Sequence, residues 1–190
     1  MPTAMEHDGH LVNHVELIHR PGERDLAVRF FETLGWTVAD VTERFGARTP
    51  YLCAFPGALA DDPLNNVIYL SEIQTPQTLD SLLRDRSEDD AELRDVVAQY
   101  DVATRRLGGA MHFGVRYRDF DELEELMKRL EERLPSELEG RVTVQAPFAV
   151  ALPALGTEVL QGFVHTDVVG AGLFPFGQLI ELQAQRALAA

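Results

Sequence analysis

The chain has 190 residues and a mass of 21.2 kDa, which suits one domain or two small modules around a shared core. Hydrophobic residues make up 45% and charged residues 25%, a composition that excludes intrinsic disorder. The 31 acidic residues outnumber the 17 basic ones, and the formal charge is −14. We therefore expect neither a nucleic-acid partner nor binding to anionic membranes.

The single cysteine, Cys53, excludes internal disulfides and zinc sites built from cysteines. No apolar run approaches the roughly 18 residues that span a bilayer. The first ten residues are polar and include Glu6 and Asp8, which is not typical of a signal peptide. These features predict a soluble, cytoplasmic, acidic protein.

The first half of the chain begins with a strand-like run over 14–20, followed by a helix over 23–34. Ala27, Phe30, Phe31 and Leu34 of this helix have helical spacing, and Gly35 is placed to end it. Strand-like runs follow at 36–42, 50–55 and 66–74. A helical connector then covers 76–109, with Ser87 and Asp90 as candidate helix caps.

The second half repeats this order. A strand-like run over 112–118 precedes a helix that opens with a capping box, Asp119 and Glu122, and stops at Pro135. The apolar stripe of the helix consists of Leu123, Leu126, Met127, Leu130 and Leu134. Strand-like runs follow at 141–148, 158–167 and 178–183.

Two short motifs recur in the same order in both halves. His14 and His112 each begin the pattern His, two residues, an aliphatic residue, two residues, Arg, while 70–74 and 179–183 share Leu-x-Glu-aliphatic-Gln. We therefore predict an α+β fold of two βαβββ modules. The expected boundaries are a tail at 1–10, a first module at 11–75, the connector at 76–109 and a second module at 110–186.

The repeated polar residues lie on strands whose other face is apolar. Because side chains alternate along a strand, His14 points to the opposite face from Val15 and Leu17. Glu181 likewise points to the opposite face from Ile180 and Leu182. If the halves pair about a pseudo-twofold axis, four polar side chains converge, namely His14, Glu72, His112 and Glu181. Two imidazoles and two carboxylates suit one divalent transition metal, such as Zn, Ni, Co, Fe or Mn.

The sequence resembles the vicinal oxygen chelate superfamily, which includes glyoxalase I, methylmalonyl-CoA epimerase, extradiol dioxygenases and bleomycin-resistance proteins. The resemblance is carried by Asn13-His14-Val15, by 27–36 (AVRFFETLGW), by Met111-His112-Phe113 and by 177–182 (GQLIEL). It implies paired modules that form a cupped mixed β-sheet around a metal. His14 and Glu72 would be the ligands of the first module, and His112 and Glu181 those of the second.

An alternative overlay concerns Glu72. Placing Val67-Ile68-Tyr69-Leu70 on the family's usual Val-Ile-Glu-Leu puts Tyr69 at the ligand position, whereas the internal match to Glu181 favours Glu72. Strand parity allows only one of the two to face the metal unless a bulge intervenes. With Tyr69 inward, the set would be two histidines and one carboxylate, an open iron(II) set.

Other residues are candidates for substrate contact. Glu16 shares the parity of His14, and Arg116 shares that of His112. Arg116 would either bind an anionic substrate group or form an ion pair with Glu16. The loop Gly170–Gly177 carries Phe174 and Phe176, which would form walls over the pocket. His165 is a weaker candidate for contact with the substrate.

The resemblance implies a metal-dependent isomerase, epimerase or lyase that holds vicinal oxygens of a small substrate on the metal. Glu72 or Glu181 would move a proton as a general base. The alternatives are an iron(II) extradiol-type dioxygenase and a non-catalytic small-molecule binding or resistance protein. The family also forms sites across dimers, so a homodimer is a further expectation.

Overall fold

The computed structural model describes residues 13–48, 50–57, 64–72, 74–105, 112–171 and 177–188. Its first half consists of β1 (His14–His19), α1 (Arg24–Thr33), β2 (Thr37–Asp40), β3 (Tyr51–Phe55) and β4 (Val67–Glu72). Its second half consists of β5 (His112–Arg116), α4 (Phe120–Glu132), β6 (Val142–Leu152), β7 (Thr157–Thr166) and β9 (Gln178–Ala187). Short elements in this half are β8 (Val169–Gly170) and the 3-10 turns η1 (Ser136–Leu138) and η2 (Pro153–Leu155).

Both halves arrange their strands in the same spatial order. The sheets run β1-β4-β3-β2 and β5-β9-β7-β6, with the first strand of each half parallel to the last. The remaining pairs in each half are antiparallel. The predicted α+β fold of two βαβββ modules is therefore confirmed, and it has the architecture that the superfamily resemblance implies.

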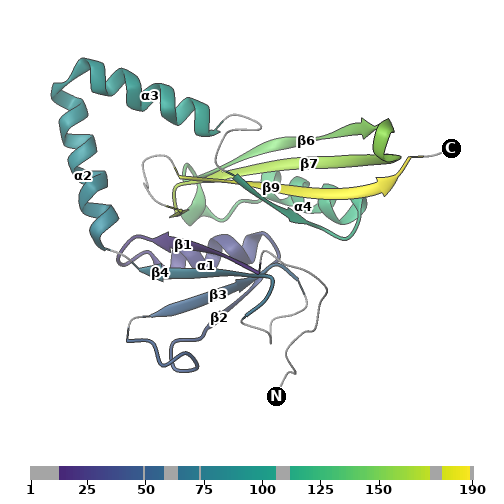
Figure 1. The fold of residues 1–190 in the computed structure, drawn as a ribbon, viewed down its shortest axis with the longest axis horizontal. Helices are drawn as coiled ribbons and strands as arrows, with labels where there is room; N and C mark the ends of the chain where they lie inside the picture. Colours follow the sequence, from purple (N-terminus) through teal and green to yellow (C-terminus); the bar gives the residue numbers. More distant parts are fainter. Residues whose placement is uncertain are drawn as a thin grey trace.

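The paired modules contribute one sheet each, a five-stranded sheet in the order β2-β3-β4-β1-β8 and a four-stranded sheet in the order β5-β9-β7-β6. β1 does not pair with β5. Its C-terminal end pairs instead with β8 from the second half, through Ile18 with Gly170 and His19 with Val169. Figure 1 shows the two sheets lying one above the other.

One hydrophobic core joins the two halves. Phe30 and Phe31 of α1 and Leu123 and Met127 of α4 are buried with the apolar faces of both sheets. At the seam, Tyr117 accepts a hydrogen bond from Trp36 Nε1 (2.9 Å) and donates one to the Leu34 carbonyl (2.9 Å). Burial raises the pKa of Tyr117, so its hydroxyl stays protonated and available as a donor.

The start of α4 follows the expected cap with one change. Asp119 Oδ1 accepts a hydrogen bond from the Glu122 backbone N–H (2.9 Å), as a capping box requires. Glu122 reaches back to the backbone N–H of Arg118 (3.1 Å). In a standard capping box this glutamate would accept the N–H of the N-cap residue Asp119. Here it accepts the N–H of the preceding residue, Arg118.

The connector forms two helices, α2 (Gln74–Asp89) and α3 (Ala91–Arg105), which extend from one side of the molecule (left in Figure 1). Asp90 caps α3 as predicted, accepting a hydrogen bond from the Leu93 backbone N–H (3.0 Å). The expectation that Ser87 caps a helix is wrong, because Ser87 lies inside α2 and donates to the Arg84 carbonyl. No helix within the described ranges is long and apolar enough to cross a membrane.

A cluster of charged residues also connects the halves. Arg141 donates to Asp167 Oδ1 (2.5 Å) within its own half and to Glu23 Oε2 (3.0 Å) at the start of α1. Arg20 at the end of β1 donates to the Asp167 carbonyl (2.6 Å). These side chains are half-buried, and Arg141 donates to two carboxylates at once. Its ion pairs are therefore stronger than ordinary surface ion pairs.

We predict that Arg141→Ala lowers the free energy of unfolding by about 1–2 kcal/mol, because Glu23 and Asp167 lose their shared donor. Urea denaturation followed by the fluorescence of Trp36 measures the change. The control is Arg129→Ala, which removes one exposed ion pair with Glu125 within α4 and should change stability by less than about 0.5 kcal/mol. Equal effects of the two substitutions would contradict a role for Arg141 in joining the halves.

Candidate metal and ligand site

The structure brings together two of the predicted ligands, His112 and Glu181. Gly114 of β5 is paired with Glu181 of the parallel strand β9, so His112, Gly114 and Glu181 share one face of the second sheet. His112 Nε2 lies 3.2 Å from Glu181 Oε2. Glu181 is 8% exposed, while the His112 side chain is more accessible.

Two glutamines hold the other oxygen of this carboxylate. Gln183 Nε2 donates to Glu181 Oε1 (3.0 Å), and Gln161 Nε2 from β7 makes a short hydrogen bond to the same atom. These bonds offset the cost of burying Glu181 and leave Oε2 directed toward His112. Gln183 is the last residue of the motif shared by 70–74 and 179–183 and lies on the face of Glu181, but the motif indicated no role for it at the site, and Gln161 was not singled out.

The donor set fits a divalent cation in part. Two ligands that each lie roughly 2.0–2.2 Å from one ion are about 3.0–3.5 Å apart, and the separation of 3.2 Å between His112 Nε2 and Glu181 Oε2 falls within this range. Among the described residues, however, no group of three or more His, Cys, Asp or Glu side chains is arranged to hold a metal. Within the described part of the chain, a third protein ligand is therefore not part of this pair's immediate surroundings.

In the first half, Tyr69 and not Glu72 shares the face of His14. The β1–β4 register is continuous and pairs Glu16 with Tyr69 and His19 with Glu72. The rings of His14 and Tyr69 lie 4.8 Å apart between centroids. Because no bulge interrupts the register, Glu72 points to the opposite face. The expectation that Glu72 joins His14 in one ligand set is corrected here.

Aromatic side chains occupy this face of the first sheet. Tyr51 and Tyr69 are 5.4 Å apart between ring centroids, and Phe45 contacts both rings edge-on. Burial, with Glu16 and Tyr69 as smaller causes, raises the pKa of Tyr51 to about 12. The neighbouring Cys53 is fully buried, and its burial raises the thiol pKa to about 11, so it is not a reactive thiolate.

A pocket of about 370 Å³ lies at the seam where β1 and β5 approach each other without pairing. His14 and Val67 line its first-half side, and Phe113, Gly114 and Val115 line its second-half side. A Cβ added at Gly114 would lie 3.9 Å from Glu181 Oε2, an ordinary van der Waals contact, so Gly114 lies directly beside this carboxylate. His14 lines this pocket, whereas His112 and Glu181 are not among its described lining residues.

The other predicted site residues have different surroundings. Arg116 is exposed on the face of His112 and lines a smaller hollow of about 180 Å³ with Trp36 and Glu122. His165 is buried, and Gly177, at φ +62°, packs so closely that a Cβ there would lie 2.8 Å from the His165 ring. Phe174 and Phe176 lie outside the described residues.

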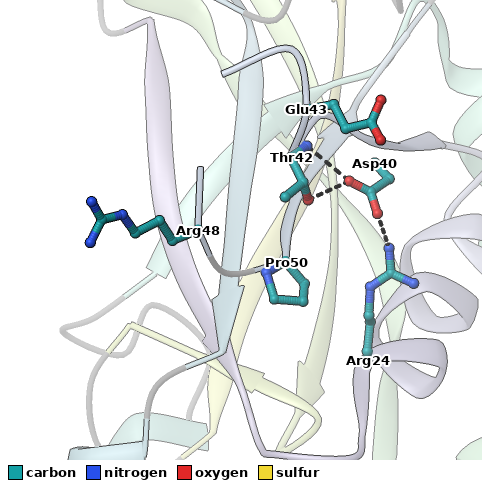
Figure 2. A pocket seen from close by; sticks show the side chains of 6 residues that line it. All are labelled: Arg24, Asp40, Thr42, Glu43, Arg48 and Pro50. Atoms are coloured by element: carbon teal, nitrogen blue, oxygen red, sulfur yellow. Dashed lines mark hydrogen bonds and ion pairs between the residues drawn. The ribbon is translucent and has the colours of Figure 1, made fainter. Parts of the chain in front are cut away.

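A larger surface hollow of about 740 Å³ contains none of the predicted site residues (Figure 2). Asp40 accepts hydrogen bonds from the Thr42 backbone N–H (2.9 Å) and hydroxyl (2.5 Å). It also forms an ion pair with Arg24 (2.6 Å). The bonds from Thr42, with a smaller contribution from Arg24, lower the pKa of Asp40. In Figure 2 Arg48 points away from this network, so the hollow does not gather its polar groups around one point.

Comparisons with known proteins give distant structural likeness only. No protein-family model matches the chain, and no curated protein matches it. A possible glyoxalase from Bacillus cereus is 13% identical with a TM-score of 0.41, over 92% of this chain and 98% of that chain. An integron cassette protein from the mobile metagenome of the Halifax Harbour sewage outfall is 15% identical with a TM-score of 0.41, over 92% and 99%. Sequence identities and TM-scores this low say nothing about activity.

We predict that Glu16→Gln lowers the pKa of Tyr51 below about 12 but leaves it above the ordinary tyrosine value, because burial remains the largest cause of the shift. Phenolate absorbance after rapid pH jumps measures this pKa, and Tyr51→Phe identifies its signal. Glu72→Gln is the matched control and should leave the Tyr51 pKa unchanged, because Glu72 lies on the opposite face. A shift in the control as large as that in Glu16→Gln would contradict the strand register.

Proposed function

We propose that the chain is a metal-dependent enzyme in which His112 and Glu181 hold a divalent transition metal, with His14, which lines the seam pocket, as the candidate for a third ligand once the metal is bound. The observation that supports it best is the His112–Glu181 pair, with its 3.2 Å separation and its two supporting glutamines. Buried metal-binding carboxylates are commonly oriented by such hydrogen bonds. Glu72 takes no part in this proposal because it points to the other face.

The substrate proposed is a small molecule with two neighbouring oxygens. A bound divalent metal supplies Lewis acidity toward such oxygens, which favours proton transfer at the adjacent carbon. Glu181 Oε2 would accept that proton only after leaving the metal, because Oε1 is occupied by the amides of Gln161 and Gln183. Arg116, exposed on the same face, would bind an anionic group of the substrate, and Phe174 and Phe176 stay predicted walls.

We predict that the purified protein binds one equivalent of Zn, Ni, Co, Mn or Fe and unfolds at a higher temperature with the metal. His112→Ala and Glu181→Gln should lower metal affinity by about 100-fold or more, and His14→Ala should lower it to a smaller degree. Gln161→Leu should lower it by about 10–100-fold with all ligands intact. Elemental analysis and titration with each metal provide the measurement.

Glu72→Gln is the matched control for Glu181→Gln, since both replace a carboxylate on a strand by the amide of nearly the same volume. Metal binding should survive in this control. If the wild-type protein contains no metal and gains no thermal stability from any of the five ions, the metal proposal fails. The non-catalytic binding protein then becomes the better description, with His112 and Glu181 as a hydrogen-bonded pair.

A second candidate is an iron(II) extradiol-type dioxygenase, which the position of Tyr69 favours. With Glu72 on the opposite face, the candidate ligands are His14, His112 and Glu181, and two histidines with one carboxylate are typical of iron(II) oxygenases. This set leaves more positions on the metal for a substrate and dioxygen than four protein ligands would.

We predict that the metal-loaded protein exchanges the proton beside the carbonyl of an α-hydroxy ketone with deuterated solvent and consumes no oxygen with catechol. Nuclear magnetic resonance follows the exchange, and an oxygen electrode follows the consumption. The iron-loaded and zinc-loaded proteins are compared, because zinc does not support redox chemistry. Catechol-dependent oxygen uptake by the iron form alone would favour the dioxygenase over proton transfer.

A further inference from the structure

A bulge in β6 turns Phe148 onto the face of the second sheet that carries Glu181. Val144, earlier in β6, packs against the hydrophobic core on the opposite face. Because side chains alternate, a regular strand would send Phe148 to the same side as Val144. The register with β7 shifts just before Phe148, however, and pairs Phe148 with Gln161. Gln161 donates a hydrogen bond to Glu181, so the bulge places an aromatic ring on the face of the candidate metal pair.

Phe163 of β7 connects this ring to the candidate metal ligands. Phe163 is paired directly with Glu181 of β9 and is 3% exposed. The centroid of its ring lies 6.2 Å from that of His112, edge to face, and 6.3 Å from that of Phe148, in a stacked arrangement. Both separations are typical of favourable aromatic pairs. His112, Phe163 and Phe148 therefore form a continuous aromatic row that begins at the metal pair.

The outer end of the aromatic row is accessible and lies among uncharged residues. Phe148 is 39% exposed, and residues 142–157 contain no Asp, Glu, Lys or Arg. In β7 the only such residue is Glu158, which pairs with Arg186 on the opposite face, where Arg186 covers the Phe120 ring of α4. A charged group of a ligand would lose water at Phe148 without gaining a partner. This end of the row therefore favours a neutral, apolar part of a ligand.

We propose that Phe163 and Phe148 bind an uncharged aryl group of a substrate whose two neighbouring oxygens are held at His112 and Glu181. The substrate class is then an aryl-substituted hydroxy ketone, which is narrower than the class in the proposed function, on which this inference rests. Neighbouring strands are about 4.8 Å apart, so β6 lies about 10 Å from β9. A phenyl ring next to the metal-bound carbonyl and the Phe148 side chain together span this distance.

The geometry of the aromatic row favours a flat ring over an aliphatic group. The planes of the Phe148 and Phe163 rings lie within 14° of each other, so a ligand ring can extend the same stack. An aliphatic group of equal size would bury a similar apolar area but would lack the stacking contribution. That contribution corresponds to about a 3- to 10-fold difference in affinity.

The test compares 2-hydroxyacetophenone with cyclohexyl hydroxymethyl ketone, which has a similar size but no aromatic ring. Ligand-observed nuclear magnetic resonance titration of the protein as purified measures both dissociation constants. The wild-type protein should bind the phenyl ketone about 3- to 10-fold more tightly. Phe148→Leu should abolish this preference because it keeps an apolar side chain without a ring, and Phe148→Tyr should retain it.

A second measurement uses the metal-loaded protein and the deuterium exchange described above. The ratio of the exchange rates of 2-hydroxyacetophenone and hydroxyacetone should fall about 3- to 10-fold in Phe148→Leu and remain high in Phe148→Tyr. Leu155→Ala is the control, because it removes a 73% exposed apolar side chain from the turn η2 that follows β6. It should leave both the affinity preference and the exchange ratio unchanged. Circular dichroism establishes that each variant folds.

The outcomes separate this inference from the metal proposal. Equal wild-type affinities for the two ketones, or a phenyl preference that survives in Phe148→Leu, would overturn the aryl subsite even if the protein binds metal and catalyses exchange. A phenyl preference that depends on the ring at position 148 would support the subsite even if the protein binds no metal. An equal loss of preference in Leu155→Ala would show unspecific apolar binding and would also overturn the proposal.

Discussion

The strand register between the first and last strands of each half is the constraint on which the rest of the structure depends. β1 and β4 run parallel without a bulge, as do β5 and β9, and this fixes the face of every side chain on these four strands. In the second half it brings His112 and Glu181 together on one face. In the first half the same rule brings Tyr69 beside His14 and turns Glu72 away. A shift of the β1–β4 register by one residue would exchange the faces of Tyr69 and Glu72. The register therefore decides whether a phenol or a carboxylate lies beside His14.

The two halves share a fold but have different chemistry on corresponding faces. The second half presents an imidazole, a buried carboxylate and two amides connected by hydrogen bonds. The first half presents a histidine ring packed against tyrosines, with Cys53 and other apolar residues beneath them. Polar groups able to act on a substrate are therefore concentrated on one half, while the other offers a largely aromatic surface beside the seam pocket. Such a division suits a site where one half performs the chemistry and the other contacts the ligand.

The seam between the halves is held by interactions of two kinds. Helices α1 and α4 bury their apolar stripes in one core, which supplies the nonspecific part of the stability. Directional bonds of Tyr117 with Trp36, and of Arg141 with Glu23, set the relative position of the two sheets. β8 adds a backbone connection by pairing with β1. β8 occupies β1 there, whereas near His14 the described residues of the two halves line the seam pocket.

The sequence by itself determined the repeated βαβββ order, the positions of α1 and α4, and the strand face on which His112 and Glu181 each lie, because periodicity and parity are local properties of the chain. It did not determine whether Glu72 or Tyr69 faces inward. The internal repeat favours Glu72 and the family pattern favours Tyr69, and the two residues lie on opposite faces because they are an odd number of positions apart. Only the observed β1–β4 register decides between them. The split into two sheets and the supporting roles of Gln161 and Gln183 also required the tertiary structure. They arise from contacts between segments far apart in the chain, such as Gln161 with Glu181, for which the sequence carries no local signal.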